Sequence, residues 1–100
     1  MKVSNMTSNK GNKIANQFIV SDNQVSFFQS YNSVIARKDL TTNEITLDEH
    51  YWNYSQTTSK YRNIFLAMTT KEILKAIKEN TIKFDSLNDM EGTSKSRFIA

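Results

Sequence analysis

Residues 28–66 read FQSYNSVIARKDLTTNEITLDEHYWNYSQTTSKYRNIFL, and the hydrophobic pattern that decides the fold changes its period within this stretch. The segments 33–38 and 44–48 carry the β-branched or alternating apolar residues that are typical of strands. From Tyr61 onward, apolar side chains recur every three or four residues, which is the spacing of one helix face. The stretch therefore predicts strands followed by a helix.

The segment before this stretch continues the strand pattern. Two apolar runs, 18–20 and 25–28, flank a polar turn that contains Asp22 and Asn23, and they predict a hairpin. Together with the two later strands, this hairpin predicts a small antiparallel sheet of three or four strands. One face of such a sheet packs against the core and the other faces solvent.

Two helices are expected after the sheet. Ser55 and its neighbours up to Ser59 offer hydroxyl groups that can cap the first helix. Its apolar stripe is formed by Tyr61, Ile64, Phe65 and Met68. Thr69 and Glu72 have the spacing of a capping box, which predicts the start of a second helix. We expect the buried face of that helix to be formed by Ile73, Leu74 and Ile77. Its solvated face is expected to be formed by Lys71, Lys75 and Lys78.

The predicted fold class is α+β, a small antiparallel three- or four-stranded sheet followed by two packed helices. Residues 17–84 form this single domain. Residues 1–16 carry three Lys, no acid and no apolar periodicity, so we expect a disordered basic arm. Residues 85–100 are expected to be a polar, flexible tail. The chain contains no Cys and no apolar run of membrane-spanning length, which predicts a cytoplasmic protein.

Few residues of this chain are suited to covalent or metal chemistry. His50 is the only His, and Asp48 and Glu49 precede it. Neighbouring residues of an extended segment point to opposite faces, so Glu49 is poorly placed to orient the imidazole as a general base. One His and scattered carboxylates do not match a metal-ligand spacing. We therefore predict a non-enzymatic protein without cofactor or metal.

Side chains suited to recognition occur around Tyr31 and in 51–62. Tyr31 stands among amides and hydroxyls, a composition common in adaptable recognition surfaces. We expect Trp52 to plug the junction between sheet and helices. An anion at the N-terminus of the first helix is a weaker expectation there than ordinary capping. The candidate partner-binding residues are Tyr31, Asn32, Arg37, Lys38, Tyr54, Lys60 and Arg62.

Several uncommon residues occur in this chain in the same order as in a known group of proteins. FQSYNS at 28–33, YWNYS at 51–55 and the later pairs Thr57-Thr58, Lys60-Tyr61 and Phe65-Leu66 resemble a pattern in short, mostly uncharacterised proteins of phages and plasmids of Gram-positive bacteria. The resemblance covers residues 16–80 and implies a mobile-element origin. Small phage proteins without catalytic residues often bind their targets stoichiometrically, and anti-CRISPR proteins resemble this chain in size and compactness.

The leading hypothesis is a non-enzymatic inhibitor of a bacterial defence nuclease, an anti-CRISPR protein with a Cas9 ribonucleoprotein as the favoured target. If the target surface is basic, a DNA-mimicking acidic surface would replace the basic candidates, formed by Asp39, Glu44, Asp48 and Glu49. One alternative is a DNA- or RNA-binding accessory protein that uses the basic helices and Lys2, Lys10 and Lys13. Another is a small structural homo-oligomer, such as a homodimer.

Overall fold

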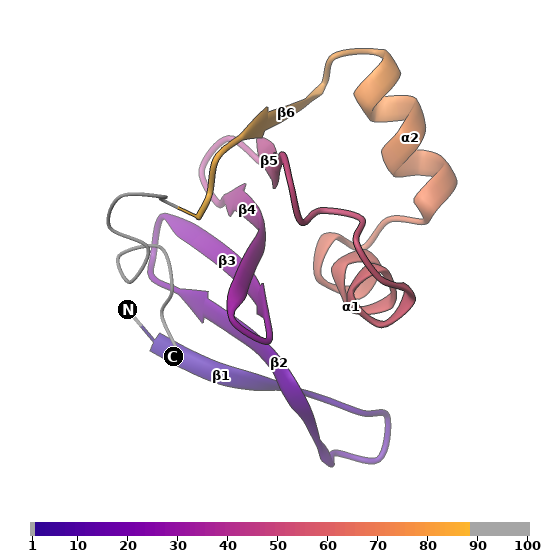
Figure 1. Cartoon of the computed structure of the whole chain (residues 1–100). Coiled ribbons are helices and arrows are strands. Elements are labelled where there is room, and N and C mark those ends of the chain that lie inside the picture. The colour runs from indigo at the N-terminus through magenta and orange to yellow at the C-terminus, as the bar shows by residue number, and fades with distance from the viewer. Residues whose placement is uncertain (1, 89–100) are drawn as a thin grey trace.

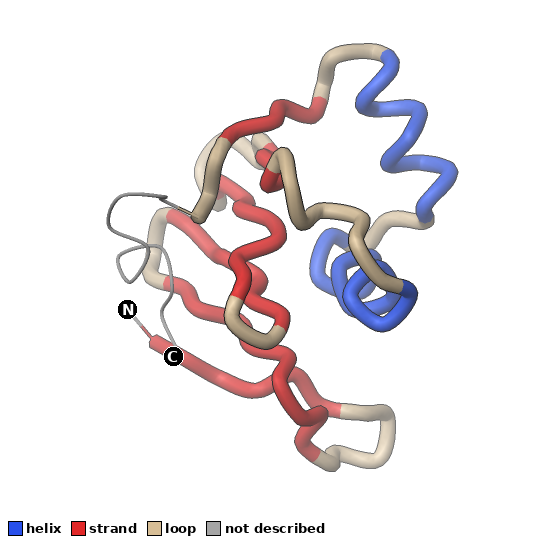
Figure 2. Tube along the Cα trace, viewed as in Figure 1, coloured by secondary structure: helices blue, strands red, loops and turns tan. Residues whose placement is uncertain are grey.

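The computed structural model describes residues 2–88 of the chain. These residues form one β-sheet, and both helices lie on the same side of it (Figure 1). The sheet is continuous, with the spatial order β1-β2-β3-β4-β5-β6. Figure 2 shows the strands in red and the two helices in blue. In chain order, the elements are β1 (Lys2–Thr7), β2 (Lys13–Ser21), β3 (Val25–Ser30), β4 (Ser33–Asp39), β5 (Ile45–Asp48), α1 (Gln56–Leu66), α2 (Thr70–Lys78) and β6 (Ile82–Asp85).

The described sheet is mixed. Strands β1 to β5 form an antiparallel meander, whereas β6 lies parallel to β5. Parallel neighbours need a crossover connection, and α1 and α2 provide it. The expected antiparallel sheet of three or four strands was therefore wrong, because the described residues form six strands of mixed direction. The α+β class holds.

Of the two additional strands, β1 comes from a segment that was expected to lie outside the domain, whereas β6 lies almost wholly within the expected domain but was not predicted as a strand. β1 and the start of β2 occupy most of the region 1–16, which was expected to be a disordered arm. Only Val3 and Met6 are apolar in β1, so its sequence lacks clear alternation. At the other end, β6 reaches Asp85 and residues 86–88 are also described. The rest of the expected tail, residues 89–100, lies outside the described residues.

The residues after β6 complete the end of the sheet. Strand β5 pairs only with residues 36–38 of β4, and Asn88 contacts the earlier part of β4 at Val34. The Asn88 Oδ1 accepts a hydrogen bond from the Val34 backbone N–H, and its Nδ2 donates one to the Val34 carbonyl, both at 2.8 Å. The Asn88 side chain thus substitutes for one residue of a neighbouring strand. This contact joins residues that are 54 positions apart.

Buried apolar residues form two clusters within residues 2–88, and Phe65 of α1 packs against both. The first cluster joins β4, β5 and β6 to both helices through Ala36, Leu47, Leu66, Ile73 and Ile82. The second contains Met6, Phe28 and Ile35, with Tyr61 and Phe65 of α1 packed against it. The rings of Phe28 and Phe65 stack with centroids 5.9 Å apart. No helix among residues 2–88 is long and apolar enough to cross a membrane.

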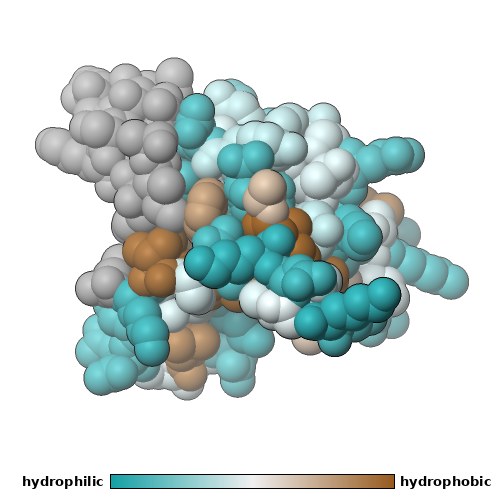
Figure 3. Space-filling view, turned by 90° about the horizontal axis from the view of Figure 1, so that it is seen from below, coloured by the Kyte–Doolittle hydropathy of each residue, from teal (hydrophilic) through white to brown (hydrophobic). Residues whose placement is uncertain are grey.

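The predicted helix starts are confirmed, but part of the predicted buried faces is wrong. Ser55 caps α1, and Thr69 and Glu72 form the capping box of α2. However, Ile64 and Leu74 are 57% and 51% exposed. Figure 3 shows that the hydrophobic residues visible on one face of the molecule form separate patches among hydrophilic ones. In α1 the fully buried positions 58, 62 and 66 include Thr58 and Arg62, so the buried face of the helix is rotated from the apolar stripe.

We predict that Phe28→Ala lowers the free energy of unfolding by about 3–5 kcal/mol, because it empties the centre of the second cluster. Denaturant unfolding measures this change. Phe84→Ala on the edge strand β6 is the control, and its exposed ring should cost less than about 1.5 kcal/mol. Similar losses for the two variants would contradict this description of the core.

Candidate binding site

The structure distributes the predicted site residues over two regions. Tyr31 and Asn32 are exposed in the turn between β3 and β4. This turn lies beside the start of α1, because the hydroxyls of Ser30 and Thr58 are 2.9 Å apart. Arg37 and Lys38 are half-buried near the far end of β4. At about 3.3 Å per residue they are roughly 15 Å or more along the strand from Asn32, so the structure does not bring them into the same site.

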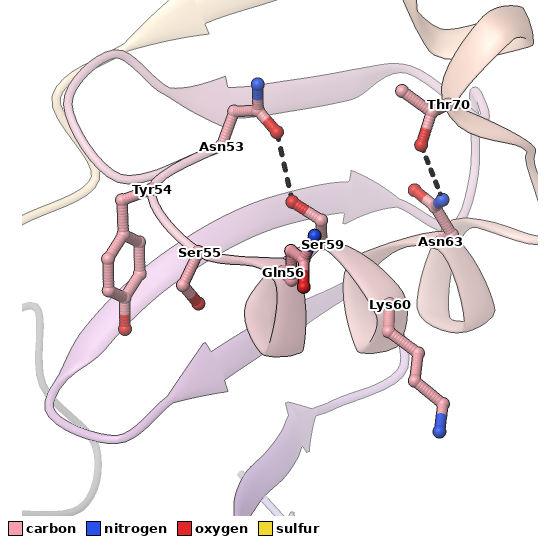
Figure 4. Close-up of a pocket in the computed structure, with 8 residues that line it drawn as sticks. All are labelled: Asn53, Tyr54, Ser55, Gln56, Ser59, Lys60, Asn63 and Thr70. Atoms are coloured by element: carbon pink, nitrogen blue, oxygen red, sulfur yellow. Dashed lines mark hydrogen bonds between the residues drawn. The ribbon is translucent and has the colours of Figure 1, made fainter.

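Tyr54 and Lys60 line an open recess at the N-terminal half of α1, which we call the α1 recess. Its volume is about 440 Å³. Figure 4 shows its side chains on the loop before α1, on successive turns of α1 and at the start of α2. The lining residues are Asn53, Tyr54, Ser55, Gln56, Ser59, Lys60, Asn63 and Thr70. None of them is acidic.

Arg62 lies beneath this recess and is not a surface residue. Its side chain is fully buried, which corrects its assignment as a partner contact. Nη1 donates to the Trp52 carbonyl at 2.7 Å and to Asn53 Oδ1 at 3.2 Å. Nε and Nη2 donate to Asn63 Oδ1 at 3.1 and 2.8 Å, and Nη2 also lies 3.5 Å from Thr70 Oγ1. The five N–H groups of the guanidinium are thus all used inside the protein.

The environment of Arg62 is polar and aromatic but carries no opposite charge. Its guanidinium carbon lies 5.3 Å from the centroid of the Trp52 ring. Burial lowers the pKa of the guanidinium, but the group stays charged because an Arg side chain is not deprotonated in proteins. The ion pairs recorded for residues 2–88, His50–Glu49 and Lys83–Glu44, do not involve it. Within the described chain, this cation is therefore surrounded by neutral oxygen atoms and the Trp52 ring, with no carboxylate among its recorded contacts.

Asp48 holds the other end of the loop that carries Tyr54. Asp48 was expected to belong to an exposed acidic surface. That expectation was wrong, because its side chain is fully buried. Oδ2 accepts hydrogen bonds from the backbone N–H groups of His50 and Tyr51, at 3.0 and 2.8 Å. Oδ1 accepts from the Leu87 backbone N–H at 2.8 Å. The loop 49–55 is therefore held by Asp48 at its start and by Arg62 at Trp52 and Asn53 in its middle.

This fixed loop divides its aromatic side chains between surface and interior. Tyr51 and Tyr54 are 37% and 47% exposed, and their rings meet edge to face with centroids 5.7 Å apart. Trp52 points the other way, against the first core cluster and 5.8 Å from the Phe84 ring. Trp52 therefore plugs the junction between sheet and helices, as expected, and the two tyrosines form an exposed pair.

The site offers hydrogen-bonding groups and aromatic surface. His50 is exposed, with Nε2 3.7 Å from Glu49 Oε1. No group of three potential metal-ligating residues is placed together among residues 2–88. The sequence reasoning missed Asn53, Asn63 and Thr70, which come from three different elements. A usable signal existed only for the part of the recess on α1, because residues three and four apart share one helix face, and this spacing joins Gln56, Ser59, Lys60 and Asn63.

We predict that Arg62→Lys lowers the free energy of unfolding by about 2–4 kcal/mol, because Lys has three donors and lacks the planar fork that reaches Trp52, Asn53 and Asn63 together. Denaturant unfolding followed by Trp52 fluorescence measures the change. Arg37→Lys on β4 is the matched control and should change stability by less than about 0.5 kcal/mol. A comparable effect at both positions would show that the Arg62 network is not a main support of the loop.

Comparison with known proteins assigns a family without an activity. No curated protein and no solved structure matches the chain. A family model described as "Family of unknown function (DUF8033)" matches residues 1–83. The match begins before β1 and ends within β6, so it includes the α1 recess and the loop 49–55. The chain therefore belongs to the DUF8033 family.

Proposed function

We propose that this protein is a non-enzymatic inhibitor of a bacterial defence nuclease and that it acts by binding its target stoichiometrically. The observation that carries the proposal is the exposed Tyr51–Tyr54 pair on the loop next to the α1 recess. Tyrosine provides a large, rigid contact area at low entropic cost, and adjacent amides and hydroxyls add adaptable hydrogen bonds. This combination suits a surface that recognises another macromolecule.

The fixed conformation of the loop supports the same proposal. Binding a flexible loop costs free energy, because its side chains and backbone must be ordered in the complex. In this protein, the hydrogen bonds of Asp48 and Arg62 already order the loop. Most of that cost is therefore met when the chain folds, and the tyrosines are presented in one arrangement.

The target class rests on the sequence resemblance described above. Small phage proteins without catalytic residues often act by binding a host protein stoichiometrically. Anti-CRISPR proteins of similar size block RNA-guided nucleases by binding alone. We therefore take a Cas9 ribonucleoprotein as the first target to test, and the exposed tyrosines as the contact residues.

We predict that cleavage of target DNA by a Cas9 ribonucleoprotein is lost when this protein is added at about one molecule per nuclease. Tyr54→Ala should raise the concentration needed for inhibition by roughly tenfold or more, since an exposed aromatic anchor is worth about 1.4 kcal/mol or more. A cleavage assay at equimolar ratio and in excess measures both effects.

The control is Leu40→Ala, which removes an exposed apolar side chain from the turn after β4 and should inhibit like the wild type. Unchanged cleavage by Cas9 enzymes from several Gram-positive hosts would reject the nuclease proposal. Equal weakening by both substitutions would reject the loop 49–55 as the contact surface.

A second candidate, a nucleic-acid-binding accessory protein, is favoured by the outer face of α2. Exposed side chains on this face follow the spacing i, i+3, i+4, i+7, and they belong to Lys71, Leu74, Lys75 and Lys78. None of these lysines takes part in an ion pair recorded for residues 2–88. Such a row of unpaired ammonium groups can contact a phosphate backbone.

For this candidate, we predict binding to bare DNA. The logarithm of the association constant should fall linearly with the logarithm of the salt concentration. Lys75→Glu should weaken binding for all sequences and reduce the salt slope by about one or more. Fluorescence anisotropy of labelled DNA measures both quantities. Lys38→Glu makes the same charge change on β4 and is the control, so an equal effect there would argue against a specific α2 surface.

A further inference from the structure

We propose that the α1 recess is a phosphate-binding site, and that it takes the phosphate group of a nucleotide or of a nucleic-acid strand. The inference concerns a ligand of this chain itself and does not depend on the identity of the inhibited nuclease. It rests on a buried cation without a counter-ion, and on the way this cation orients the polar side chains around the recess.

The first step is the unbalanced charge of Arg62. Its guanidinium is fully buried, and within residues 2–88 it contacts a carbonyl, two side-chain amides, a hydroxyl and an indole ring, all of them neutral. In a low-dielectric interior, the field of such a charge extends over several ångströms. Proteins usually pair a buried charge with an opposite one. Three hydrogen-bonding partners of Arg62, namely Asn53, Asn63 and Thr70, also line the α1 recess, so an anion in the recess would be separated from the guanidinium by these side chains alone.

The second step is the orientation of those partners. A guanidinium only donates hydrogen bonds, so each neighbour must turn an oxygen toward it. Asn53 Oδ1 accepts from Arg62 and from Ser59, which leaves Asn53 Nδ2 without a recorded acceptor in the described chain. Asn63 Oδ1 likewise accepts from Arg62, so its Nδ2 faces Thr70. Figure 4 shows the nitrogen of Asn53 on the side of its amide away from Ser59.

Thr70 continues this pattern at the start of α2. Its Oγ1 accepts from Asn63 Nδ2 at 2.9 Å and lies 3.5 Å from Arg62 Nη2. With its oxygen used as an acceptor, the hydroxyl hydrogen is left to donate elsewhere. The amide groups of Asn53 and Asn63 and the hydroxyl of Thr70 thus keep N–H or O–H hydrogens for a ligand. Arg62 thus occupies the amide oxygens of Asn53 and Asn63, and although Asn63 Nδ2 and the Ser59 hydroxyl each donate one hydrogen bond within the cluster, Asn53, Asn63 and Thr70 each keep a hydrogen for a ligand.

The third step is the match between the recess and phosphate. Gln56 and Lys60 also line the recess, although the Lys60 Nζ lies 5.3 Å from the centroid of the Tyr61 ring and its side chain runs away from Asn53 in Figure 4. None of the lining residues carries a negative charge. Donors that approach from several sides suit the several oxygens of a phosphate better than the two coplanar oxygens of a carboxylate. The volume of about 440 Å³ exceeds the size of one carboxylate, and Tyr54 provides a ring at the edge on which a base can stack.

The experiment is a titration of the ¹⁵N-labelled full chain with inorganic phosphate at constant ionic strength, with chloride and acetate as comparison anions. We expect saturable shifts of the side-chain NH₂ signals of Asn53 and Asn63 with phosphate alone. Parallel titrations with adenosine monophosphate and with a short single-stranded oligonucleotide then identify the source of the phosphate. Tighter binding of the oligonucleotide assigns the site to a strand, and tighter binding of the monophosphate assigns it to a free nucleotide.

The decisive variant is Asn53→Asp. It keeps an oxygen for Arg62 and Ser59, supplies the missing counter-charge and removes the free NH₂ group. Phosphate binding should weaken by roughly tenfold or more, while the melting temperature stays equal or rises. Asn43→Asp adds the same charge in the turn before β5 and should bind phosphate like the wild type. If Asn53→Asp does not fold, Lys60→Gln and Gln56→Ala replace it, each with an expected loss of binding of roughly threefold or more.

Three outcomes would overturn the proposal: no saturable shift with any phosphate compound, an equal response to acetate, or wild-type binding by the folded Asn53→Asp variant. An equal response to acetate would instead point to an acidic side chain of a partner protein. These outcomes are separate from those of the nuclease assay. Loss of phosphate binding with intact inhibition, or the reverse, would show that the recess and the Tyr51–Tyr54 surface act independently.

Discussion

The buried guanidinium of Arg62 is the interaction on which the candidate site depends. It joins the loop before α1, the middle of α1 and the start of α2, through Trp52, Asn63 and Thr70. A side chain with fewer donors could not satisfy three segments at once, because each segment presents its oxygen from a different direction. The exposed position of Tyr54 and the donors of the α1 recess both follow from where this network holds the loop. A buried cation thereby shapes the candidate site without lining it.

Asp48 and Asn88 have a related role at the open end of the sheet. Backbone groups there have no neighbouring strand, and buried polar groups without partners are costly. The carboxylate of Asp48 accepts three backbone N–H groups, and the amide of Asn88 pairs with both backbone groups of Val34. Polar side chains thus form hydrogen bonds with the backbone groups that have no partner strand at this end of the sheet. Because these contacts also fix the residues after β6, the fold and the loop 49–55 are stabilised by the same groups.

Several elements were predictable because their signals are local. The hairpin turn depends on Asp22, whose carboxylate accepts the N–H groups of Gln24 and Val25. The starts of α1 and α2 depend on Ser55 and on the Thr69–Glu72 pair, within three residues of each cap. The apolar stripe of α1 was less informative. Thr58 and Arg62 take buried positions because their polar groups find partners across the fold, and Ile64 is left exposed.

The sequence by itself determined the α+β class, the order of strands before helices, the hairpin turn and both helix starts. Each of these follows from side chains that act on backbone only a few residues away. Tertiary structure alone decided the addition of β1 and β6 to the sheet, the burial of Arg62 and Asp48, and the composition of the α1 recess. These features depend on pairs of groups far apart in the chain, such as Asn88 and Val34. A hydrogen bond between such groups forms only when the fold brings them together, and neither residue signals its partner in its own neighbourhood.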